Sequence, residues 1–465
     1  MIRNRDVHAR RTAGSALAAM VALGLVLVPT LSASAATGGS NWWYAKYDVA
    51  AAQAAGWTGA GVKIAVIDGQ INTALPVFQG ANLTVSPKSF CDNSTPADTT
   101  TANKGSSHGS DVTALLVGNG TGTGSVKGIA PKATATFYAV ASQGGGTTGC
   151  SLVRRDGLSY SPFGLAILKA IGDGNRIISI SQIDSSTPGG DLHAVAEAAA
   201  RGVVIVAGQP NTAAQASAAE RFPADANGVV ATNAFDEQGN LQTQDGKTTA
   251  YSTTTVVGAG AGFPAQASAT DVWGDNQGSI IGSSLSTPLV AGMLALTLQK
   301  YPTATGNQLI QSLIVNTTAK DHPLSFDSTG YGYGPASLSH LLRVDPTQYP
   351  DINPLLNKPG GLGVPTTAEF AAAAKAASPN PSASPSAAAA PSPDQAAGSV
   401  LPGLLTGVVV VVLLLLVLAG LAVVLMRSLR RKAVPSTPAS VGPADALPNA
   451  AASDSAGPIV DDRDH

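Results

Sequence analysis

Three side chains of this sequence, Asp68, His108 and Ser284, could together activate a nucleophile. A serine hydroxyl is a poor nucleophile until a neighbouring imidazole accepts its proton. The imidazole in turn needs a buried carboxylate that fixes its tautomer and stabilises the imidazolium. If the fold brings these three groups together, they would support nucleophilic acyl transfer, in which the serine attacks a carbonyl carbon.

Ser284 lies in a small-residue turn that runs straight into an apolar segment. Residues 282–284 read Gly-Ser-Ser, and the apolar run 289–298 that follows has helical character. We expect Pro288 in the first turn of this helix, where its missing N–H costs nothing. A serine at such a helix start lies near free N–H groups that can bind an oxyanion. A capped core helix is the alternative interpretation of this stretch taken alone.

His108 stands apart from the other histidines between residues 36 and 352. It lies between the aspartate and the serine in the chain, at the expected start of an apolar helical stretch, residues 112–117, and Gly109 lets the backbone turn tightly behind it. A lone histidine is more often structural than catalytic, so the hypothesis that His108 is the catalytic base rests on its position in the chain. The others, on a mixed helix face or in late polar segments, are His193, His322 and His340.

Strand and helix patterns alternate from Trp42 to about Asp351 and predict one α/β domain with a parallel sheet covered by helices on both faces. Residues 62–67 (VKIAVI) are apolar and β-branched, as expected of a buried parallel strand, and they end at Asp68. Catalytic residues in such sheets gather at the carboxyl ends of the strands. The other predicted strands are 133–141, 176–181 and 203–207, and the predicted helices are 162–171 and 191–201.

Three ordered motifs resemble the subtilase family. GVKIAVIDG resembles the aspartate segment of that family, HGSDVTALL its histidine segment and GSSLSTPLVAG its serine segment, and the order Asp, His, Ser is that of subtilisin. With supporting stretches at 128–131, 222–224 and 331–334, the resemblance covers roughly residues 45–342. It implies a subtilisin-like serine endopeptidase in which Asp68 orients His108, His108 is general base and then acid, and Ser284 attacks the scissile carbonyl.

The resemblance also implies an oxyanion hole, formed by the backbone N–H of Ser284 and a second donor. In subtilases that donor is an asparagine amide within an A-G-N signature, whereas this chain has Ala207-Gly208-Gln209. Gln209 keeps the carboxamide and adds a methylene, so we expect it to be the second donor, with Asn211 as the alternative.

Other departures from the family pattern leave two hypotheses open. Gly69-Gln70 follows the aspartate, Asp111 replaces a second histidine, and Ser181-Gln182-Ile183 stands where Ser-Leu-Gly usually lines the substrate cleft. The first hypothesis is an active endopeptidase that cuts exported proteins. The second is a catalytically weak or inactive subtilase-fold scaffold that supports a membrane secretion assembly.

The two cysteines, Cys91 and Cys150, are expected to form one structural disulfide. An even count in an exported domain favours pairing, and closing a loop of this length stabilises a fold by a few kcal/mol. Neither a Cys–His nor a CxxC spacing is present. The sequence also has no acidic loop of the kind that typically binds calcium. We therefore expect no metal and no cofactor.

Both ends of the chain indicate a membrane-anchored protein. We expect a cleaved signal peptide at 1–35, a peptidase domain at 36–352, a Pro/Ala/Ser-rich linker at 353–402, a transmembrane helix at 403–426 and a cytoplasmic tail at 427–465. Basic residues directly after the span place that end in the cytoplasm and the peptidase domain outside. Trp42, Trp43 and Tyr44 are expected to pack onto the peptidase domain.

This layout is similar to that of the mycosins, membrane-anchored subtilases associated with type VII secretion in actinobacteria. The similarity implies a protein or peptide substrate and components of a secretion assembly as partners, in addition to the membrane. The formal net charge of −2, with charged residues at only 12%, gives no electrostatic footprint for nucleic acid.

Overall fold

The computed structural model describes residues 41–121, 126–142, 145–146, 149–184, 186–212, 221–244, 247–264 and 279–378. The expected signal peptide, membrane span and cytoplasmic tail all lie outside these residues. None of the helices in the described part of the chain is long and apolar enough to cross a membrane.

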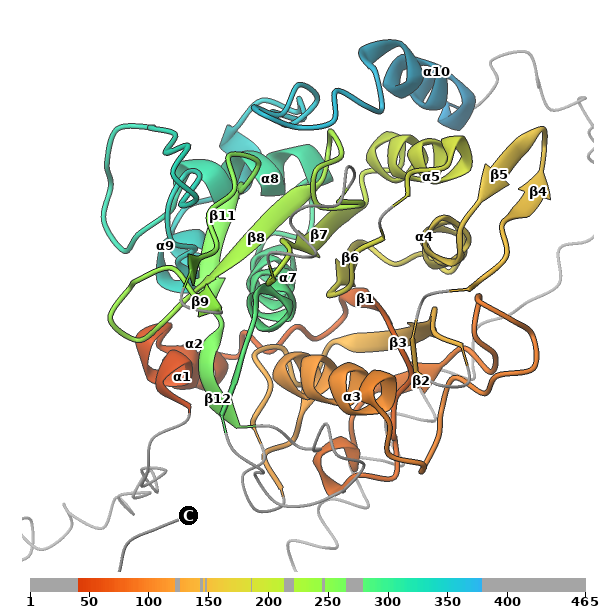
Figure 1. Ribbon diagram of the computed structural model, residues 1–465. Helices are drawn as coiled ribbons and strands as arrows, with labels where there is room; N and C mark the ends of the chain where they lie inside the picture. The colour runs from red at the N-terminus through yellow and green to blue at the C-terminus, as the bar shows by residue number, and fades with distance from the viewer. Residues whose placement is uncertain are drawn as a thin grey trace, which may run out of the picture. The chain divides into compact units, whose positions relative to one another are not determined.

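Seven parallel strands form the main sheet, in the order β11-β8-β7-β6-β1-β3-β2 (Figure 1). Strand β1 lies between β6 and β3, with Asp68 as its last residue, so the carboxyl ends of β1, β6 and β7 are neighbours at one edge. The strands are β1 Lys63–Asp68, β2 Leu83–Val85, β3 Thr134–Ala139, β6 Ile177–Ile180, β7 Val204–Gly208, β8 Val230–Phe235 and β11 Val256–Ala259.

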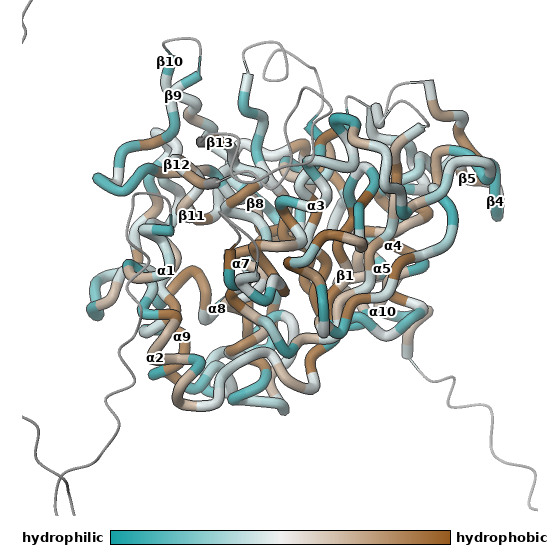
Figure 2. The backbone as a smooth tube through the Cα atoms, turned by 90° about the horizontal axis from the view of Figure 1, so that it is seen from below, coloured by the Kyte–Doolittle hydropathy of each residue, from teal (hydrophilic) through white to brown (hydrophobic). Residues whose placement is uncertain are grey.

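Helices cover both faces of this sheet. Alternate residues of β1 point to opposite sides: Ile64 and Val66 pack in the core that holds α3 (Lys104–Val117) and α7 (Ser283–Lys300), whereas Ala65 and Ile67 pack with α4 (Pro162–Gly172) and α5 (Gly189–Ala200). Figure 2 shows hydrophobic colour along α7 and β1 inside the fold. The predicted parallel α/β sheet with helices on both faces is confirmed.

The remaining elements lie around these layers. Three short antiparallel pairs are present among the described residues: β4–β5 (Val153–Arg155 and Leu158–Tyr160), β9–β10 (Thr243–Gln244 and Lys247–Thr248) and β12–β13 (Ala261–Pro264 and Ser279–Ile281). The other helices are α1 Trp42–Lys46, α2 Val49–Ala54, α8 Gly306–Val315, α9 Leu338–Arg343 and α10 Thr367–Ala377, with 3₁₀ turns at Pro76–Phe78 and Pro346–Gln348.

Two helices begin earlier than the apolar patterns indicated. Helix α3 starts at Lys104 because Asn103 and Ser106 form a capping box, so His108 is its fifth residue and lies within the helix rather than at its start. Helix α7 starts at Ser283, so Pro288 lies beyond its first turn. Since Pro288 has no N–H for the carbonyl of Ser284, the hydroxyl of Ser181 donates to that carbonyl instead, at 2.9 Å.

The peptidase domain extends further than the expected boundary at 352. Residues 353–378, which we expected to be linker, carry helix α10, whose Phe370 and Ala373 are buried against Ala196 of α5. Leu355 is also buried. The alanine-rich composition of α10 suggested a spacer, but alanine is the best helix former, and Thr366 begins the helix with a capping box.

The N-terminal aromatic residues pack onto the domain, as predicted. Trp43 is fully buried, and the indole N–H of Trp42 donates to the carbonyl of Ala261 at 2.7 Å. Cys91 and Cys150 are joined by a disulfide, with their Cα atoms 4.9 Å apart. The loop that this disulfide closes contains α3 and β3.

Candidate active site

Asp68 and His108 meet at the carboxyl end of β1. Asp68 is fully buried, and its Oδ1 accepts the backbone N–H of Gly69 at 2.7 Å. Helix α3 can approach this strand end because Gly109 has no side chain: a Cβ there would lie 2.1 Å from the carbonyl oxygen of Gln70. His108 Nδ1 consequently lies 2.8 Å from Asp68 Oδ1, and because a carboxylate can only accept, Nδ1 is the donor.

The electrostatics around His108 favour its protonated form. Burial by itself would lower the pKa of His108, but the charge of Asp68, its hydrogen bond to the ring and the charge of Asp111 together raise that pKa above its usual value. The side chain keeps 32% of its surface exposed, so the ring remains open to the pocket beside it. His108 can therefore exchange a proton with a group that enters this pocket.

Ser284, the second residue of α7, borders the same pocket as His108. The pocket has a volume of about 340 Å³ and is also lined by Ser181, Gln182, Gln209 and Asn211. Helix α7 packs against α3, which carries the histidine, and its first turn lies beyond the ends of β6 and β7. His108, Gln182, Gln209 and Ser284, which the sequence nominated from four separate segments, thus line one cavity, and Asp68 lies behind His108.

The carboxamide of Gln209 is held at the wall of this pocket. Its Nε2 donates to Thr253 Oγ1 at 2.8 Å, and Thr253 donates in turn to Asp225 Oδ1 at 2.6 Å. Gln209 Oε1 is buried without a hydrogen-bond partner. Gln209 borders the pocket as expected, and its role as oxyanion donor stays a prediction.

Asn211 brings a second carboxamide to the pocket. Its Oδ1 accepts from the backbone N–H of Ser283 at 2.9 Å and from Gln242 Nε2 at 2.8 Å, and it lies 3.0 Å from the Ser283 hydroxyl, which donates to the carbonyl of Gln209. A Cβ placed on Gly282 would lie 3.0 Å from Ser284 Oγ and 3.1 Å from Asn211 Nδ2. The amide nitrogen and the serine hydroxyl are therefore within about 6 Å of each other.

Gln182 makes a contact that the sequence did not indicate. Its Nε2 lies 3.1 Å from Asp68 Oδ1 and 3.1 Å from His108 Nδ1. The sequence marked this position only as a departure in the cleft wall. The strand order would have predicted this contact. Because β6 pairs with β1, a residue just past the end of β6 must lie beside the residue that ends β1.

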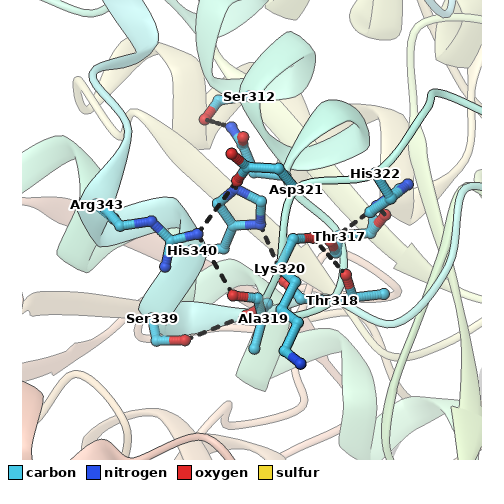
Figure 3. Close-up of polar contacts among 12 residues, drawn as sticks. Ser312, Thr317, Thr318, Ala319, Lys320, Asp321, His322, Ser339, His340 and Arg343 are labelled. Carbon is cyan, nitrogen blue, oxygen red and sulfur yellow. Dashed lines mark hydrogen bonds and ion pairs between the residues drawn. The ribbon is translucent and has the colours of Figure 1, made fainter.

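A second Asp–His pair, Asp321 and His340, lacks the ring nitrogen that His108 has available to accept a proton (Figure 3). His340 Nε2 lies 3.0 Å from Asp321 Oδ1, and its Nδ1 lies 3.1 Å from the carbonyl oxygen of Thr318. Since both ring nitrogens face oxygen atoms and the ring is buried, His340 has no nitrogen left to accept a proton from a hydroxyl. His322, nearby in the same view, likewise contacts oxygens through both nitrogens, those of Thr317 and Pro323.

Comparison with known proteins supports the sequence motifs. The sequence profile described as the Subtilase family matches residues 59–334, more than half of the chain. Subtilisin BL from Lederbergia lenta is 29% identical over 301 residues, which cover 63% of this chain and 95% of that relative. M-protease from Shouchella clausii (strain KSM-K16) is 29% identical over 283 residues, which cover 59% of this chain and 64% of the length of that relative.

Among solved structures, the chain is similar to the crystal structure of MycP1 with the N-terminal propeptide removed. The TM-score is 0.50 at 18% sequence identity, covering 67% of this chain and 99% of the other. At this identity the likeness concerns the fold.

Proposed function

The chain belongs to the subtilase family of serine endopeptidases, and we propose that it hydrolyses peptide bonds of exported proteins with Asp68, His108 and Ser284 as its catalytic triad. The observation that carries this proposal is the 2.8 Å contact between Asp68 and His108 beside a pocket that Ser284 also borders. Acyl transfer requires an imidazole and a serine that share a cavity and a buried carboxylate that holds the imidazole from behind.

In the proposed mechanism, the tautomer of His108 decides the direction of proton flow. Nδ1–H is held by Asp68 Oδ1, which leaves Nε2 to accept the proton of the Ser284 hydroxyl as that oxygen attacks the scissile carbonyl. The imidazolium is stabilised by Asp68 and then protonates the leaving amine. Water hydrolyses the acyl-enzyme by the same proton path in reverse.

We assign the second oxyanion donor to Asn211 rather than to Gln209. Two N–H donors, from Ser283 and Gln242, fix Asn211 Oδ1, and its Nδ2 end lies on the side of Gly282 and Ser284. The Nε2 atom of Gln209 donates to Thr253 Oγ1. With the backbone N–H of Ser284, Asn211 would supply a preorganised pair of donors for the charge that develops on the carbonyl oxygen.

A fluorophosphonate probe, which reacts only with an activated serine, tests the triad on the full-length chain. We expect covalent labelling of the wild type that disappears in Ser284→Ala and in His108→Ala. Ser286→Ala is the matched control, because it removes a buried hydroxyl from the same helix, and it should keep the labelling. Absence of labelling in a wild type that retains its thermal unfolding transition would contradict the proposal.

We further propose that the domain acts at the outer face of the cell membrane and serves type VII secretion, as a mycosin. The support is the sequence: a signal peptide at 1–35, a span at 403–426 and a basic cluster directly after it. Complementation of a deletion strain separates catalysis from assembly. Loss of secretion with Ser284→Ala favours a peptidase, whereas full function with Ser284→Ala and loss on deleting 403–426 favours the scaffold hypothesis.

A further inference from the structure

The Asp68–His108 pair has a third member, Gln182, in the segment that follows β6. Its Nε2 lies at equal distances, 3.1 Å, from Asp68 Oδ1 and from His108 Nδ1. The side chain is half-buried and also borders the pocket. An amide in van der Waals reach of both partners of a proton-transfer pair must change the electrostatics of that pair.

Chemistry decides which end of the carboxamide faces the pair. An amide oxygen there would lie 3.1 Å from the carboxylate of Asp68, and both oxygens carry negative charge. The amide nitrogen can donate to Asp68 Oδ1, but it cannot donate to His108 Nδ1, because that nitrogen already carries a hydrogen directed at Asp68. The arrangement is therefore one carboxylate oxygen that accepts from Gly69, His108 and Gln182 at once.

Two consequences for His108 follow from this sharing. The donor from Gln182 draws part of the negative charge of Asp68 Oδ1 away from the imidazole. The positive end of the same N–H dipole also lies close to Nδ1, where it disfavours a second positive charge on the ring. Both effects oppose formation of the imidazolium, in the opposite sense to Asp68 and Asp111.

The other charged groups around His108 come from β1 and α3. Asp68 ends β1, Asp111 lies on α3 one turn after the histidine, and Lys104, at the start of α3, lines the pocket. Helix α7 contributes Ser284 and carries its single charged side chain, Lys300, at its far end. Gln182 is thus an uncharged side chain in direct contact with both Asp68 and His108.

We propose that Gln182 is a positioning residue that donates to Asp68 and sets the pH range in which His108 works as a general base. This inference rests on the proposed triad. An apolar side chain at this position would leave Asp68 Oδ1 with only the donors of Gly69 and His108, so the imidazole would become protonated, and the enzyme inactive, at a higher pH.

The test is the pH profile of kcat/KM for the full-length chain with a peptide substrate. Gln182→Met keeps the side-chain length and removes the donor, and we expect the midpoint of the acid limb to rise by about 0.5–1 pH unit, the value of one hydrogen bond. Gln182→Glu keeps the shape and replaces the donor by a carboxylate, so its midpoint should rise further. Ile183→Met is the matched control, since it alters the next residue of the pocket wall and should change KM without moving the midpoint.

The inference would be overturned if the acid-limb midpoint were unchanged or lowered in Gln182→Met. It would also be overturned if Gln182→Glu raised the midpoint no more than Gln182→Met does. A second measurement separates it from the proposed function. The imidazole of His108 can be titrated by NMR with labelled histidine, assigned through His108→Ala, whether or not the protein turns over substrate. A raised titration midpoint in Gln182→Met supports the role of Gln182 even if the fluorophosphonate does not label the protein. The absence of labelling would then contradict the proposed triad alone.

Discussion

At the scale of single residues, Asn211 and Gln209 can be distinguished as oxyanion donors by kinetics. Loss of one oxyanion-hole donor lowers the rate by about 10²–10³-fold. We expect Asn211→Asp, which keeps the acceptor that holds Ser283 and removes the Nδ2 donor, to lower kcat in this range with little change in KM. Gln209→Ala should lower kcat much less. Steady-state kinetics of both variants, with thermal unfolding as the control for folding, measure the difference, and the reverse order would return the role to Gln209.

The proposed functional residues differ in how far the sequence could predict them. The local sequence around each of three residues is enough to identify it. Asp68 ends an apolar strand, His108 precedes a glycine in a helical stretch, and Ser284 lies in a small-residue turn before a helix. The roles proposed for Gln182 and Asn211 rest on contacts with neighbours far along the chain, Asp68 and Ser283. Those contacts depend on strand order and on the side-chain directions of two loops, which no local pattern contains.

At the scale of elements, the close packing of α7 on α3 should be essential, since it places Ser284 and His108 at the same pocket. Gly292, in the middle of α7, makes this approach possible: a Cβ there would lie 2.1 Å from Ile129 Cγ2 and 3.3 Å from Leu116 Cδ1 of α3. We expect Gly292→Ala to lower the free energy of unfolding by about 1–3 kcal/mol, as overpacking does. It should also lower kcat, because Ser284 moves with the helix.

A matched glycine on another helix serves as the control for this prediction. At Gly172, the last residue of α4, an added Cβ would have no neighbouring atom within 4 Å, so Gly172→Ala should leave stability and kcat near wild type. Urea unfolding and steady-state kinetics give the comparison. Equal stability of the two variants would show that the α3–α7 contact accommodates an added methyl group without overpacking. The apolar pattern predicted both α3 and α7. The early start of α3 depended on a local capping box that this pattern does not include, whereas the hydrogen bond from Ser181 that accommodates Pro288 in α7 is a tertiary feature.

At the scale of the whole molecule, the segment after residue 352 should stabilise the peptidase domain. It buries Leu355 and Phe370, and each such side chain contributes about 1.5–3 kcal/mol when removed from water. We expect a chain of residues 36–378 to unfold at a clearly higher temperature than one of residues 36–352. Calorimetry of the two chains measures this, and equal unfolding temperatures would restore the shorter boundary that the composition indicated.

Lys358, in the same segment, should make the stability of the domain depend on pH in the alkaline range. The side chain is buried, its Nζ donates to the carbonyl of Ala224 at 2.5 Å, and burial lowers the pKa of Lys358 to about 7, although the charge of Asp225 opposes the shift. The unfolded chain therefore binds more protons than the folded one between about pH 7 and the ordinary lysine pKa of about 10.4, and the free energy of unfolding rises with pH across this window. Below pH 7 both states are protonated, and the cost of burying the charge is complete.

Replacing Lys358 should consequently have an effect that changes with pH. Each unit of pKa shift is worth about 1.4 kcal/mol, which exceeds the value of the single hydrogen bond to Ala224 that is lost. We expect Lys358→Met to stabilise the domain most at pH 6, less at pH 8 and hardly at all at pH 10, as measured by urea unfolding of the full-length chain. Lys375→Met, at an exposed site on α10, is the control and should change little at any pH. A stability difference between Lys358→Met and wild type that is the same at pH 6 and pH 10 would mean that the ammonium group is solvated and that the segment is less tightly docked.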